Sequence, residues 1–382
     1  MLGIVGTGVS GLRVCAELIE GGYNEPIVAW DAENREPYDR THLSKDLFHR
    51  YFEPLAAQGY GDLAELGVQV RHLEVRSIQQ RSSAVSTGLP TRAESSPMWM
   101  VTDDEGTTEV DTLVIASGTS VEARIPGALR LQTAQDAEDL LDALQGAHRV
   151  AILGAGWTGT ELASALTDAG IHVDMYSASG HVLRSDLPGV GDAVIGAWMQ
   201  QAGVGLHQMP PHTPALEGYD VVIQAFGSRP NTQIVEPFAD LTPSGTIVTT
   251  LAGQVLRDGT PVPGLYASGD CASALDPDGG FLAGNHWNRC LGQASRTAAA
   301  VLGNPLPARL EPAEIFSTQF GHEVSLVGTL PKPADAPDTH ERTSEGESFT
   351  WTDADGTLIA AFSYDSPRDV SKARKALRRK IS

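Results

Sequence analysis

The chain opens on Met1-Leu-Gly-Ile-Val-Gly-Thr-Gly-Val-Ser-Gly11, a short apolar run followed directly by three glycines and then by a helical pattern. In a strand–turn–helix unit of this kind, Gly6 forms the tight turn, Gly8 lets a pyrophosphate approach the backbone and Gly11 lets the helix pack on the strand. The phosphates then bind the free N–H groups at the helix N-terminus. This stretch therefore predicts a dinucleotide site.

The spacing alone is weak evidence, because 40 of the 382 residues are glycine. The following residues strengthen it. Ile27-Val-Ala-Trp30 is expected to form the second strand, and Asp31 and Glu33 come after it, about 20 residues beyond the glycines, where an acceptor for ribose hydroxyls belongs.

The same arrangement occurs a second time, in Arg149-Val-Ala-Ile-Leu-Gly154-Ala-Gly156-Trp-Thr-Gly159-Thr-Glu161. Chance explains one glycine hexapeptide easily, but not two that each lie between an apolar strand and a helix. The chain therefore binds two dinucleotides, or one of the two units is a decayed duplicate. We expect two occupied sites.

The second unit lacks the acidic residue that the first one has. After the strand predicted at 171–176, Ser177-Ala-Ser179 stands where a carboxylate would bind the ribose diol, and Arg184 follows a few residues later. An arginine near this turn commonly accommodates a 2′-phosphate. The alternative is a solvated surface arginine.

Composition narrows the possible partners and compartment. The 48 acidic and 27 basic residues give a net charge of −21, which argues against nucleic acid or an anionic membrane as a general partner. No apolar segment is long enough to span a bilayer and no signal peptide is expected, so the sequence predicts a cytoplasmic protein. Cys15, Cys271 and Cys290 are widely spaced, and we expect reduced, mostly buried thiols and no metal site.

The rest of the chain alternates strands, loops and helices. Ser44 is expected to cap a short helix, and a helix is expected to start at Gly269-Asp270, placing the Asp270 carboxylate at the mouth of a crevice. Residues 330–347 are expected to be a loop, and residues 367–380 a markedly basic helix. The predicted strands in the β-rich segments are 68–70, 98–101, 109–115, 323–327, 348–351 and 358–362.

Several motifs together carry a resemblance to a known family. They are Pro37-Tyr38-x-Arg40-x-x-Leu43-Ser44-Lys45, the paired glycine motifs, Gly227-x-Arg229-Pro230-Asn231, Tyr266-Ala-x-Gly-Asp270 and Pro367-Arg368-Asp369. With them the chain resembles, over nearly its whole length, the FAD-dependent NAD(P)H:ferredoxin reductases of oxygenase electron-transfer systems. That family includes putidaredoxin reductase and the biphenyl dioxygenase reductase component, and it has the glutathione-reductase architecture.

The resemblance implies an α/β fold with two Rossmann-like dinucleotide-binding domains, one for FAD and one for NAD(P), and a C-terminal α+β domain. Residues 1–119 and 239–308 would form the FAD-binding domain, and residues 120–238 the NAD(P)-binding domain. Residues 309–382 would form the C-terminal interface domain.

The resemblance also implies roles for individual residues. Lys45 and Glu161 would be the catalytic pair, since Glu161 would face the nicotinamide and Lys45, and a cation beside the flavin offsets the charge that reduction places near its N1–C2 edge. The implied FAD-binding residues are Gly6, Gly8, Gly11, Asp31, Arg40, Lys45, Ala116, Gly118, Asp270 and Trp287. Those implied for NAD(P)H are Gly154, Gly156, Gly159, Glu161, Ser177, Arg184 and Gly227.

Some positions depart from the family pattern. Thr41 and His42 stand where the family usually has prolines, and Phe316 is the aromatic residue nearest to the position of a flavin-facing tryptophan. Ser177 matches the glutamate that usually selects NADH. The nicotinamide cofactor is therefore left open as NADH or NADPH.

The cysteines exclude one route for electrons. Disulfide reductases of this architecture carry a Cys-x4-Cys pair facing the flavin, and related peroxidases a cysteine near residues 43–47, but this chain has neither. The implied activity is hydride transfer from NAD(P)H to FAD, followed by single-electron transfer to a small iron–sulfur ferredoxin that feeds an oxygenase. The alternatives are an NAD(P)H oxidase using oxygen or a small acceptor, and a redox-sensing flavoprotein related to apoptosis-inducing factor.

Ferredoxins of this kind are acidic, so basic side chains on this acidic protein are candidates for docking. We predict a docking surface near Arg289, Arg296 and the basic helix 367–380. The alternative for that helix is a solvated surface with favourable helix-dipole charges.

Overall fold

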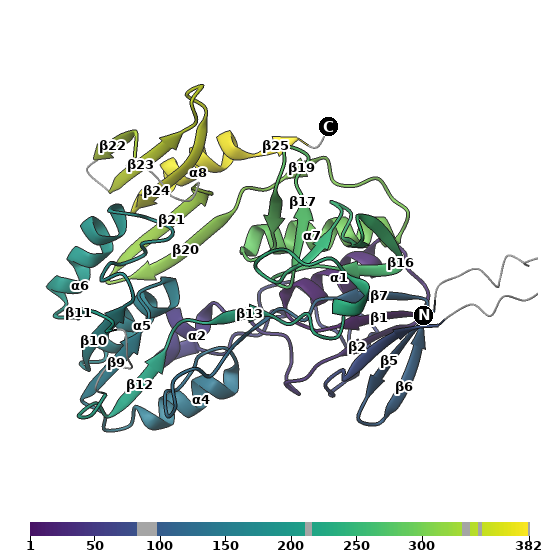
Figure 1. Cartoon of the computed structure of the whole chain (residues 1–382), viewed down its shortest axis with the longest axis horizontal. Helices are drawn as coiled ribbons and strands as arrows, with labels where there is room; N and C mark the ends of the chain where they lie inside the picture. The colour runs from purple at the N-terminus through teal and green to yellow at the C-terminus, as the bar shows by residue number, and fades with distance from the viewer. Residues whose placement is uncertain (82–97, 211–215, 331–336, 343–345, 381–382) are drawn as a thin grey trace, which may run out of the picture.

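The structure, a computed structural model, describes residues 1–81, 98–210, 216–330, 337–342 and 346–380. Three parts are visible in Figure 1. A large sheet with its helices lies on the right, a smaller parallel sheet at the lower left and an antiparallel sheet at the upper left. This arrangement confirms two Rossmann-like units and a C-terminal α+β domain.

The large sheet begins at the first glycine motif. Its central strand β1 pairs in parallel with β2 and β7, as predicted from the apolar run before Gly6. Helices α1 (Val9–Glu20) and α7 (Trp287–Val301) pack against each other. In spatial order the nine strands are β18 (Phe281–Ala283), β17 (Ala272–Leu275), β14 (Ile247–Thr249), β15 (Gln254–Arg257), β16 (Thr260–Ala267), β7 (Thr112–Ile115), β1 (Leu2–Val5), β2 (Ile27–Trp30) and β3 (Gln69–Arg71).

A separate three-stranded antiparallel sheet of β4 (Ser77–Gln80), β5 (Trp99–Asp103) and β6 (Gly106–Val110) adjoins this part. The prediction of one strand at 109–115 was wrong, because the chain changes sheet at Asp111. The N–H of Asp111 donates to the carbonyl of Met1 at 2.9 Å, and its carboxylate pairs with the N-terminal ammonium at 2.6 Å.

The prediction that a helix starts at Gly269-Asp270 was also wrong. The chain turns there and continues as β17, which pairs in parallel with β14. The turn is closed by the N–H of Ala272, which donates to the carbonyl of Gly269 at 2.9 Å. The helix begins only at Trp287.

The second part holds the second glycine motif in a four-stranded parallel sheet. Its strands lie in the order β11 (Gly205–Gln208), β10 (His172–Ser177), β9 (Arg149–Leu153) and β12 (Val221–Gln224). A two-stranded ribbon of β8 (Thr119–Val121) and β13 (Ser228–Pro230) connects it to the large sheet. The other helices up to this point are α2 (His42–Lys45), α3 (Leu47–Arg50), α4 (Ala134–Ala143), α5 (Trp157–Asp168), α6 (Ala197–Gln201), the π-helix η1 (Asp192–Gly196) and the 3-10 helix η2 (Glu236–Phe238).

The C-terminal part is a five-stranded antiparallel sheet covered by α8 (Pro367–Leu377). In spatial order its strands are β20 (Glu314–Gln319), β21 (His322–Gly328), β24 (Leu358–Tyr364), β23 (Glu347–Thr352) and β22 (Thr339–Arg342). The loop predicted over 330–347 was therefore wrong at β22. Residues 331–336 and 343–345 of that segment lie outside the described residues.

The basic helix is shorter than the predicted 367–380. It ends at Leu377, and β25 (Arg379–Lys380) then pairs with β19 (Arg309–Leu310). The guanidinium of Arg379 donates to both carboxylate oxygens of Asp276, at 3.0 and 2.8 Å. This ion pair holds the end of the chain against the large-sheet part instead of continuing the helix.

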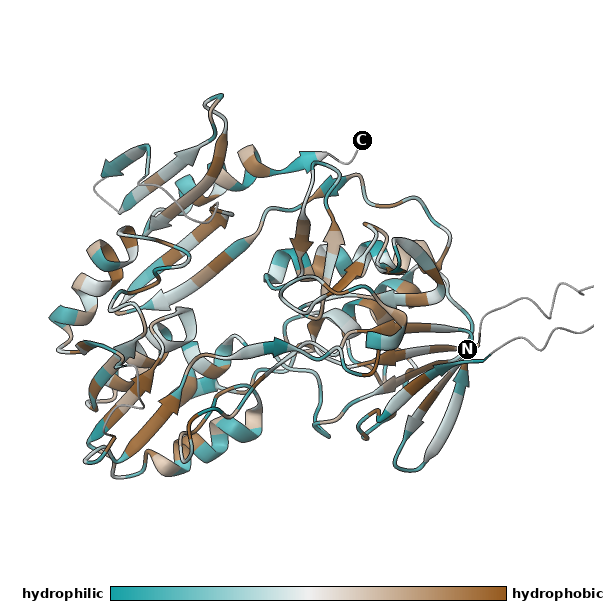
Figure 2. Cartoon of the chain, in the orientation of Figure 1, coloured by the Kyte–Doolittle hydropathy of each residue, from teal (hydrophilic) through white to brown (hydrophobic). Residues whose placement is uncertain are grey.

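One hydrophobic core runs through the second and third parts and includes α2 and α3. Leu43 and Leu47 belong to the same buried cluster as Ile152 of β9 and Phe362 of β24. Figure 2 shows the apolar residues concentrated along the strands of both parallel sheets. The packing thus fixes α2, which follows the first unit, against the other two parts. Within the described residues, every helix is too short or too polar to cross a bilayer.

Candidate functional site

Of the three glycines in the first turn, only Gly8 has open space beside its Cα. Gly6 has a φ of +101°, and a Cβ there would lie 2.3 Å from the carbonyl oxygen of Ala116. A Cβ on Gly11 would lie 2.0 Å from the carbonyl oxygen of Gly6, whereas a Cβ on Gly8 would meet nothing within 4 Å. Gly6 and Gly11 are therefore required by packing, and the backbone at Gly8 stays open to a ligand, as a bound pyrophosphate requires.

The second turn repeats this geometry. Gly154 has a φ of +116° and a Cβ there would lie 2.7 Å from the carbonyl oxygen of Ala225. A Cβ on Gly159 would lie 2.1 Å from the carbonyl oxygen of Gly154, and one on Gly156 would meet nothing within 4 Å. Both turns can hold a pyrophosphate, which supports two dinucleotide sites.

A cavity of about 410 Å³ extends from the first turn, a size typical of ligand sites. It lies between that turn, the end of β2 and the loop after β7. The predicted FAD-binding residues that line it are Gly6, Gly8, Asp31, Arg40, Ala116, Gly118 and Asp270. Residues that the sequence did not single out, such as Ser117 and Thr133, line it too.

The two acids after β2 have different environments. Asp31 is buried, and its carboxylate accepts hydrogen bonds from the backbone N–H groups of Glu33 and Arg35 at 3.2 and 3.0 Å. It also contacts the His72 ring at 3.1 Å. Asp31 therefore shapes the turn while it lines the cavity. Glu33 lines the cavity too, and its carboxylate pairs with Arg40 and accepts a hydrogen bond from the Tyr38 hydroxyl at 2.7 Å.

The carboxylate of Asp270 lines the inner part of this cavity. Burial raises its pKa to about 6, against the opposing effect of the Arg40 charge. Its carboxylate accepts no hydrogen bond from the described residues, so it can accept hydrogen bonds from the hydroxyls of a ligand in the cavity.

A second cavity, of about 610 Å³, shares Arg40 with the first, so one long ligand can run from Gly8 into it. The predicted residues Lys45, Glu161 and Trp287 line it, together with Phe316. The indole N–H of Trp287 donates to the Tyr60 hydroxyl at 3.2 Å and is thereby fixed at the wall. The two adjoining cavities are thus lined by most of the residues that the resemblance implies for FAD.

Glu161 lies buried where three elements meet. Its carboxylate accepts hydrogen bonds from the Ser44 hydroxyl of α2 at 2.5 Å and from the Ser317 hydroxyl of β20 at 2.7 Å. The prediction that Ser44 caps a helix was therefore wrong, because its hydroxyl is used by Glu161. Ser317 was missed by the sequence, which carries no local signal for a contact between residues 156 positions apart.

Lys45 lies beside this carboxylate without pairing with it directly. Its ammonium stands over the Phe316 ring, 4.1 Å from the centroid, and the described ion pairs include none between Lys45 and Glu161. Burial raises the pKa of Glu161, while the Lys45 charge lowers it. Burial lowers the pKa of Lys45, while the Glu161 charge raises it. The two opposite charges thus stabilise each other across the cavity.

The residues predicted to bind the far end of NAD(P)H lie at the edge of the second parallel sheet. Ser177 ends β10, and its buried hydroxyl donates to the carbonyl of His181 at 2.8 Å. Arg184 is exposed and has no ion pair or hydrogen bond with other described residues. Gly227 forms the turn after β12 with a φ of +91°, and its carbonyl accepts the N–H of Glu122 at 3.1 Å.

The predicted docking residues separate into different classes. Arg296 is only 4% exposed and its Nε donates to the carbonyl of Leu251 at 3.1 Å, so its prediction as a docking residue was wrong. Arg289 is half-buried and lines the second cavity. In α8, the guanidinium of Arg374 pairs with the buried carboxylate of Glu314 and so serves the fold.

All three cysteines are buried and unpaired, as predicted. Burial raises the pKa of the Cys15 thiol to about 12 and also raises the pKa of Cys271 and Cys290. None of them lines either cavity, so no thiolate is available beside Lys45. In the part of the chain that the structure describes, no three His, Cys, Asp or Glu side chains come together as metal ligands.

Comparison with known proteins gives consistent results. The family model for pyridine nucleotide-disulphide oxidoreductases matches residues 2–294. The ferredoxin–NAD(+) reductase subunit of the benzene 1,2-dioxygenase system of Pseudomonas putida is 24% identical, covering 99% of this chain and 92% of that protein. The corresponding component of the biphenyl dioxygenase system of Paraburkholderia xenovorans (strain LB400) is 24% identical, covering 100% of this chain and 94% of that protein.

Among solved structures, the covalent putidaredoxin reductase–putidaredoxin complex contains a chain that superposes with a TM-score of 0.80 at 19% identity. The match covers 98% of this chain and 92% of that one. This likeness establishes the shared fold.

Replacing Asp270 tests the first cavity. Because the pKa of Asp270 is raised to about 6 in the folded protein, its ionisation destabilises the FAD-free fold as pH rises from its ordinary value of 3.8 through about 6. Asp270→Asn should raise the Tm of the FAD-free protein at about pH 8 and leave it nearly unchanged at about pH 4. It should also weaken FAD binding about tenfold, measured by fluorescence titration. A lower Tm at both pH values, or unchanged FAD affinity, would contradict these assignments.

Replacing Glu161 tests the second cavity. Glu161→Gln keeps the side-chain shape but removes the charge beside Lys45, so the anaerobic rate of flavin reduction by NAD(P)H should fall about tenfold or more, with the Tm preserved. Glu65→Gln, at an exposed site far from the cavity, is the control and should leave the rate unchanged. The role of Glu161 is disproved if both variants reduce at the wild-type rate.

Proposed function

The chain belongs to the pyridine nucleotide-disulphide oxidoreductase family, and we propose that it is a flavoprotein reductase that uses NAD(P)H to supply electrons to a ferredoxin of an oxygenase system. The observation that carries this proposal is the cavity around Lys45 and Glu161, which continues into a cavity fitted for FAD and contains no thiol. Relatives that match over their full length, and are named as ferredoxin–NAD(+) reductase components, support it.

When bound, FAD supplies a centre that accepts two electrons as a hydride and releases them singly. The side chains around the site would position the cofactor and stabilise the charge that develops on it. Lys45 provides a positive charge beside the flavin end of the cavity, where it offsets developing negative charge. The charge of Glu161, a residue held by the Ser44 and Ser317 hydroxyls, raises the pKa of Lys45 against the effect of burial and so favours the charged ammonium.

We infer that electrons leave past Phe316. This ring is 38% exposed and lines the flavin-side cavity together with Lys45. The same two side chains also line a further cavity of about 690 Å³ bordered by Pro367 and Val370 of α8. Phe316 and Lys45 therefore separate the flavin end from a surface beside α8 that a partner can reach.

The charges on that surface come from a smaller set than the sequence predicted. Arg374 neutralises buried Glu314, and Lys372 pairs with Asp369 at 2.9 Å. Arg368 and Lys375 of α8 are exposed and have no ion pair within the described residues. We propose that these two side chains attract the acidic ferredoxin.

The second dinucleotide site also bears on the choice of nicotinamide cofactor. Ser177 carries no charge to repel a 2′-phosphate, and Arg184 is free to pair with one. We propose that the protein accepts NADPH as well as NADH.

The function is tested by steady-state assays with NADH and NADPH against a panel of ferredoxins and against oxygen. The proposal expects rapid reduction of at least one ferredoxin and slow consumption of oxygen. An enzyme that consumes oxygen as fast as it reduces every ferredoxin would instead be an oxidase.

Charge reversal tests the docking surface. The double variant Arg368→Glu/Lys375→Glu should raise the KM for ferredoxin about tenfold while the rate with ferricyanide stays at the wild-type value. The double variant Arg76→Glu/Arg81→Glu, at two exposed arginines on either side of β4, is the charge-matched control. An equal loss with both acceptors, or an unchanged KM, would remove α8 from the interface.

Two substitutions test cofactor choice. Ser177→Glu places a carboxylate against the 2′-phosphate and should lower kcat/KM for NADPH about tenfold relative to NADH. Arg184→Gln should lower the same ratio by a smaller factor. A ratio that neither substitution changes would show that these residues do not contact the cofactor.

A further inference from the structure

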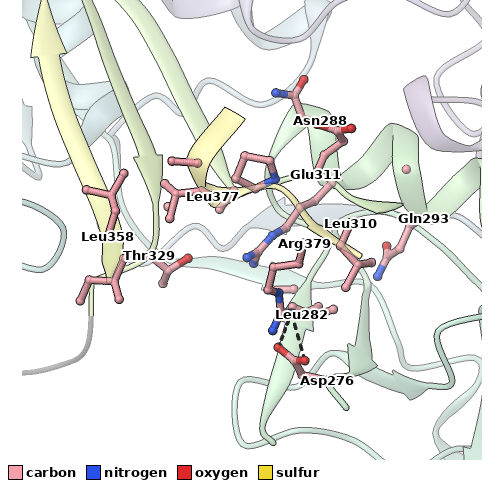
Figure 3. Close-up of a pocket in the computed structure, with 18 of the residues that line it drawn as sticks. Asp276, Leu282, Asn288, Gln293, Leu310, Glu311, Thr329, Leu358, Leu377 and Arg379 are labelled. Atoms are coloured by element: carbon pink, nitrogen blue, oxygen red, sulfur yellow. Dashed lines mark hydrogen bonds and ion pairs between the residues drawn. The ribbon is translucent and has the colours of Figure 1, made fainter. Parts of the chain in front are cut away.

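A further cavity, of about 360 Å³, lies between the large-sheet part and the C-terminal part. Its walls come from β18, α7 and β19 on one side and from β24 and α8 on the other. Figure 3 shows Leu358 and Leu377 on one side of the opening and Leu282 and Leu310 on the other, with Arg379 between them. Aliphatic side chains thus face the cavity from both sides.

The acidic side chains at this cavity already have partners. The carboxylate of Asp276 is paired with Arg379, and Figure 3 shows this pair at the edge of the cavity. Glu311 accepts from the Nε of Arg378 at 3.0 Å and lies 2.9 Å from its terminal nitrogen. These two ion pairs balance their own charges and leave no carboxylate free for another cation.

Two further arginines line the same cavity without an acidic partner. No ion pair joins Arg289 or Arg296 to any described carboxylate, and the one hydrogen bond of Arg296 is made by its Nε to the carbonyl of Leu251. Arg296 is 4% exposed and Arg289 is half-buried. Burial and the Arg289 charge lower the pKa of Arg296 to about 10, still well above neutral pH. One buried and one half-buried guanidinium, neither with a carboxylate partner among the described residues, therefore line this cavity.

Such a pair is unfavourable on its own, since buried cations are normally paired and these two repel each other. It is more notable in a protein of net charge −21, which has carboxylates in excess. The terminal nitrogens of a guanidinium bind a carboxylate in a planar, two-pronged geometry that an aliphatic surround strengthens.

We propose that this cavity binds a small organic carboxylate with an apolar body. Arg289 and Arg296 would hold the carboxylate, and Leu282, Leu310, Leu358 and Leu377 would contact the body. The volume suits a ring of the size of benzoate, and the site is separate from the nicotinamide and flavin sites of the proposed function.

The ligand would lie beside the flavin-side cavity, because Arg289, Ala283, Gly328 and Thr329 line both. Binding would also offset the repulsion between Arg289 and Arg296, which both lie on α7. Because the body of the ligand would contact Leu358 and Leu377 of the C-terminal part as well, and because a ligand that binds only the folded state stabilises it, we expect a higher Tm in its presence.

The test uses isothermal titration calorimetry on the FAD-loaded full chain, with benzoate, acetate, benzyl alcohol and inorganic phosphate as probes. Benzoate should bind about tenfold more tightly than acetate, which lacks the apolar body, and than benzyl alcohol, which lacks the charge. Tighter binding of phosphate than of benzoate would overturn the proposal in favour of a simple anion site.

Variants locate the binding. Arg289→Gln and Arg296→Met should each weaken benzoate binding about tenfold, and Lys375→Gln, which removes an exposed charge from α8, should not change it. Ala376→Glu places a carboxylate at the exposed rim and should also block binding, so the test does not depend on Arg296→Met folding.

Three results would contradict the site: no benzoate binding by the wild type, binding that survives all three substitutions, or loss in Arg289→Gln with full affinity in Arg296→Met. The last result would place benzoate in the flavin-side cavity, because Arg296 lines only the proposed site. Ferredoxin reduction measured on the wild type without benzoate separates failure of this proposal from failure of the reductase function.

Discussion

The buried carboxylate of Glu161 joins the three parts of the chain at one point. It belongs to α5 of the second unit and accepts hydroxyl hydrogen bonds from Ser44 of α2 and Ser317 of β20. A buried carboxylate is stable only where donors and an opposite charge compensate for lost solvation, and Lys45 supplies that charge. The geometry of the cavity around Lys45 therefore depends on the relative positions of all three parts.

Apolar packing also fixes the relative positions of these parts. Leu43 and Leu47 flank Ser44 and Lys45 and belong to the core that extends from β9 to β24. The short segment that carries the Ser44 hydroxyl and the Lys45 ammonium is thus fixed at both ends by side chains packed in the core. The glycine turns contribute a different constraint, since Gly6 and Gly154 each bring their backbone close to a neighbouring strand while Gly8 and Gly156 stay open.

The sequence predicted those features that depend on local chemistry. Both glycine turns and the strands around them follow from residue spacing, because a strand–turn–helix unit is specified within some tens of residues. Most of the residues that line the first cavity were implied by the family resemblance. Several of the failures involve partners that are distant in the sequence. Ser317 reaches Glu161, Arg374 neutralises Glu314 and Arg379 pairs with Asp276, and none of these pairs has a local signal. The predicted end of the basic helix and the prediction of Arg296 as a docking residue were wrong for the same reason.

The proposed reductase function depends most directly on which acceptor takes the electrons from the flavin. The decisive measurement is stopped-flow reoxidation of the protein after anaerobic reduction with one equivalent of NADPH, followed by flavin absorbance, with a ferredoxin or with air-saturated buffer as the oxidant. The account predicts complete reoxidation by the ferredoxin within the turnover time and much slower reoxidation by oxygen. Faster reoxidation by oxygen, or a reduced state that persists with both, would contradict it.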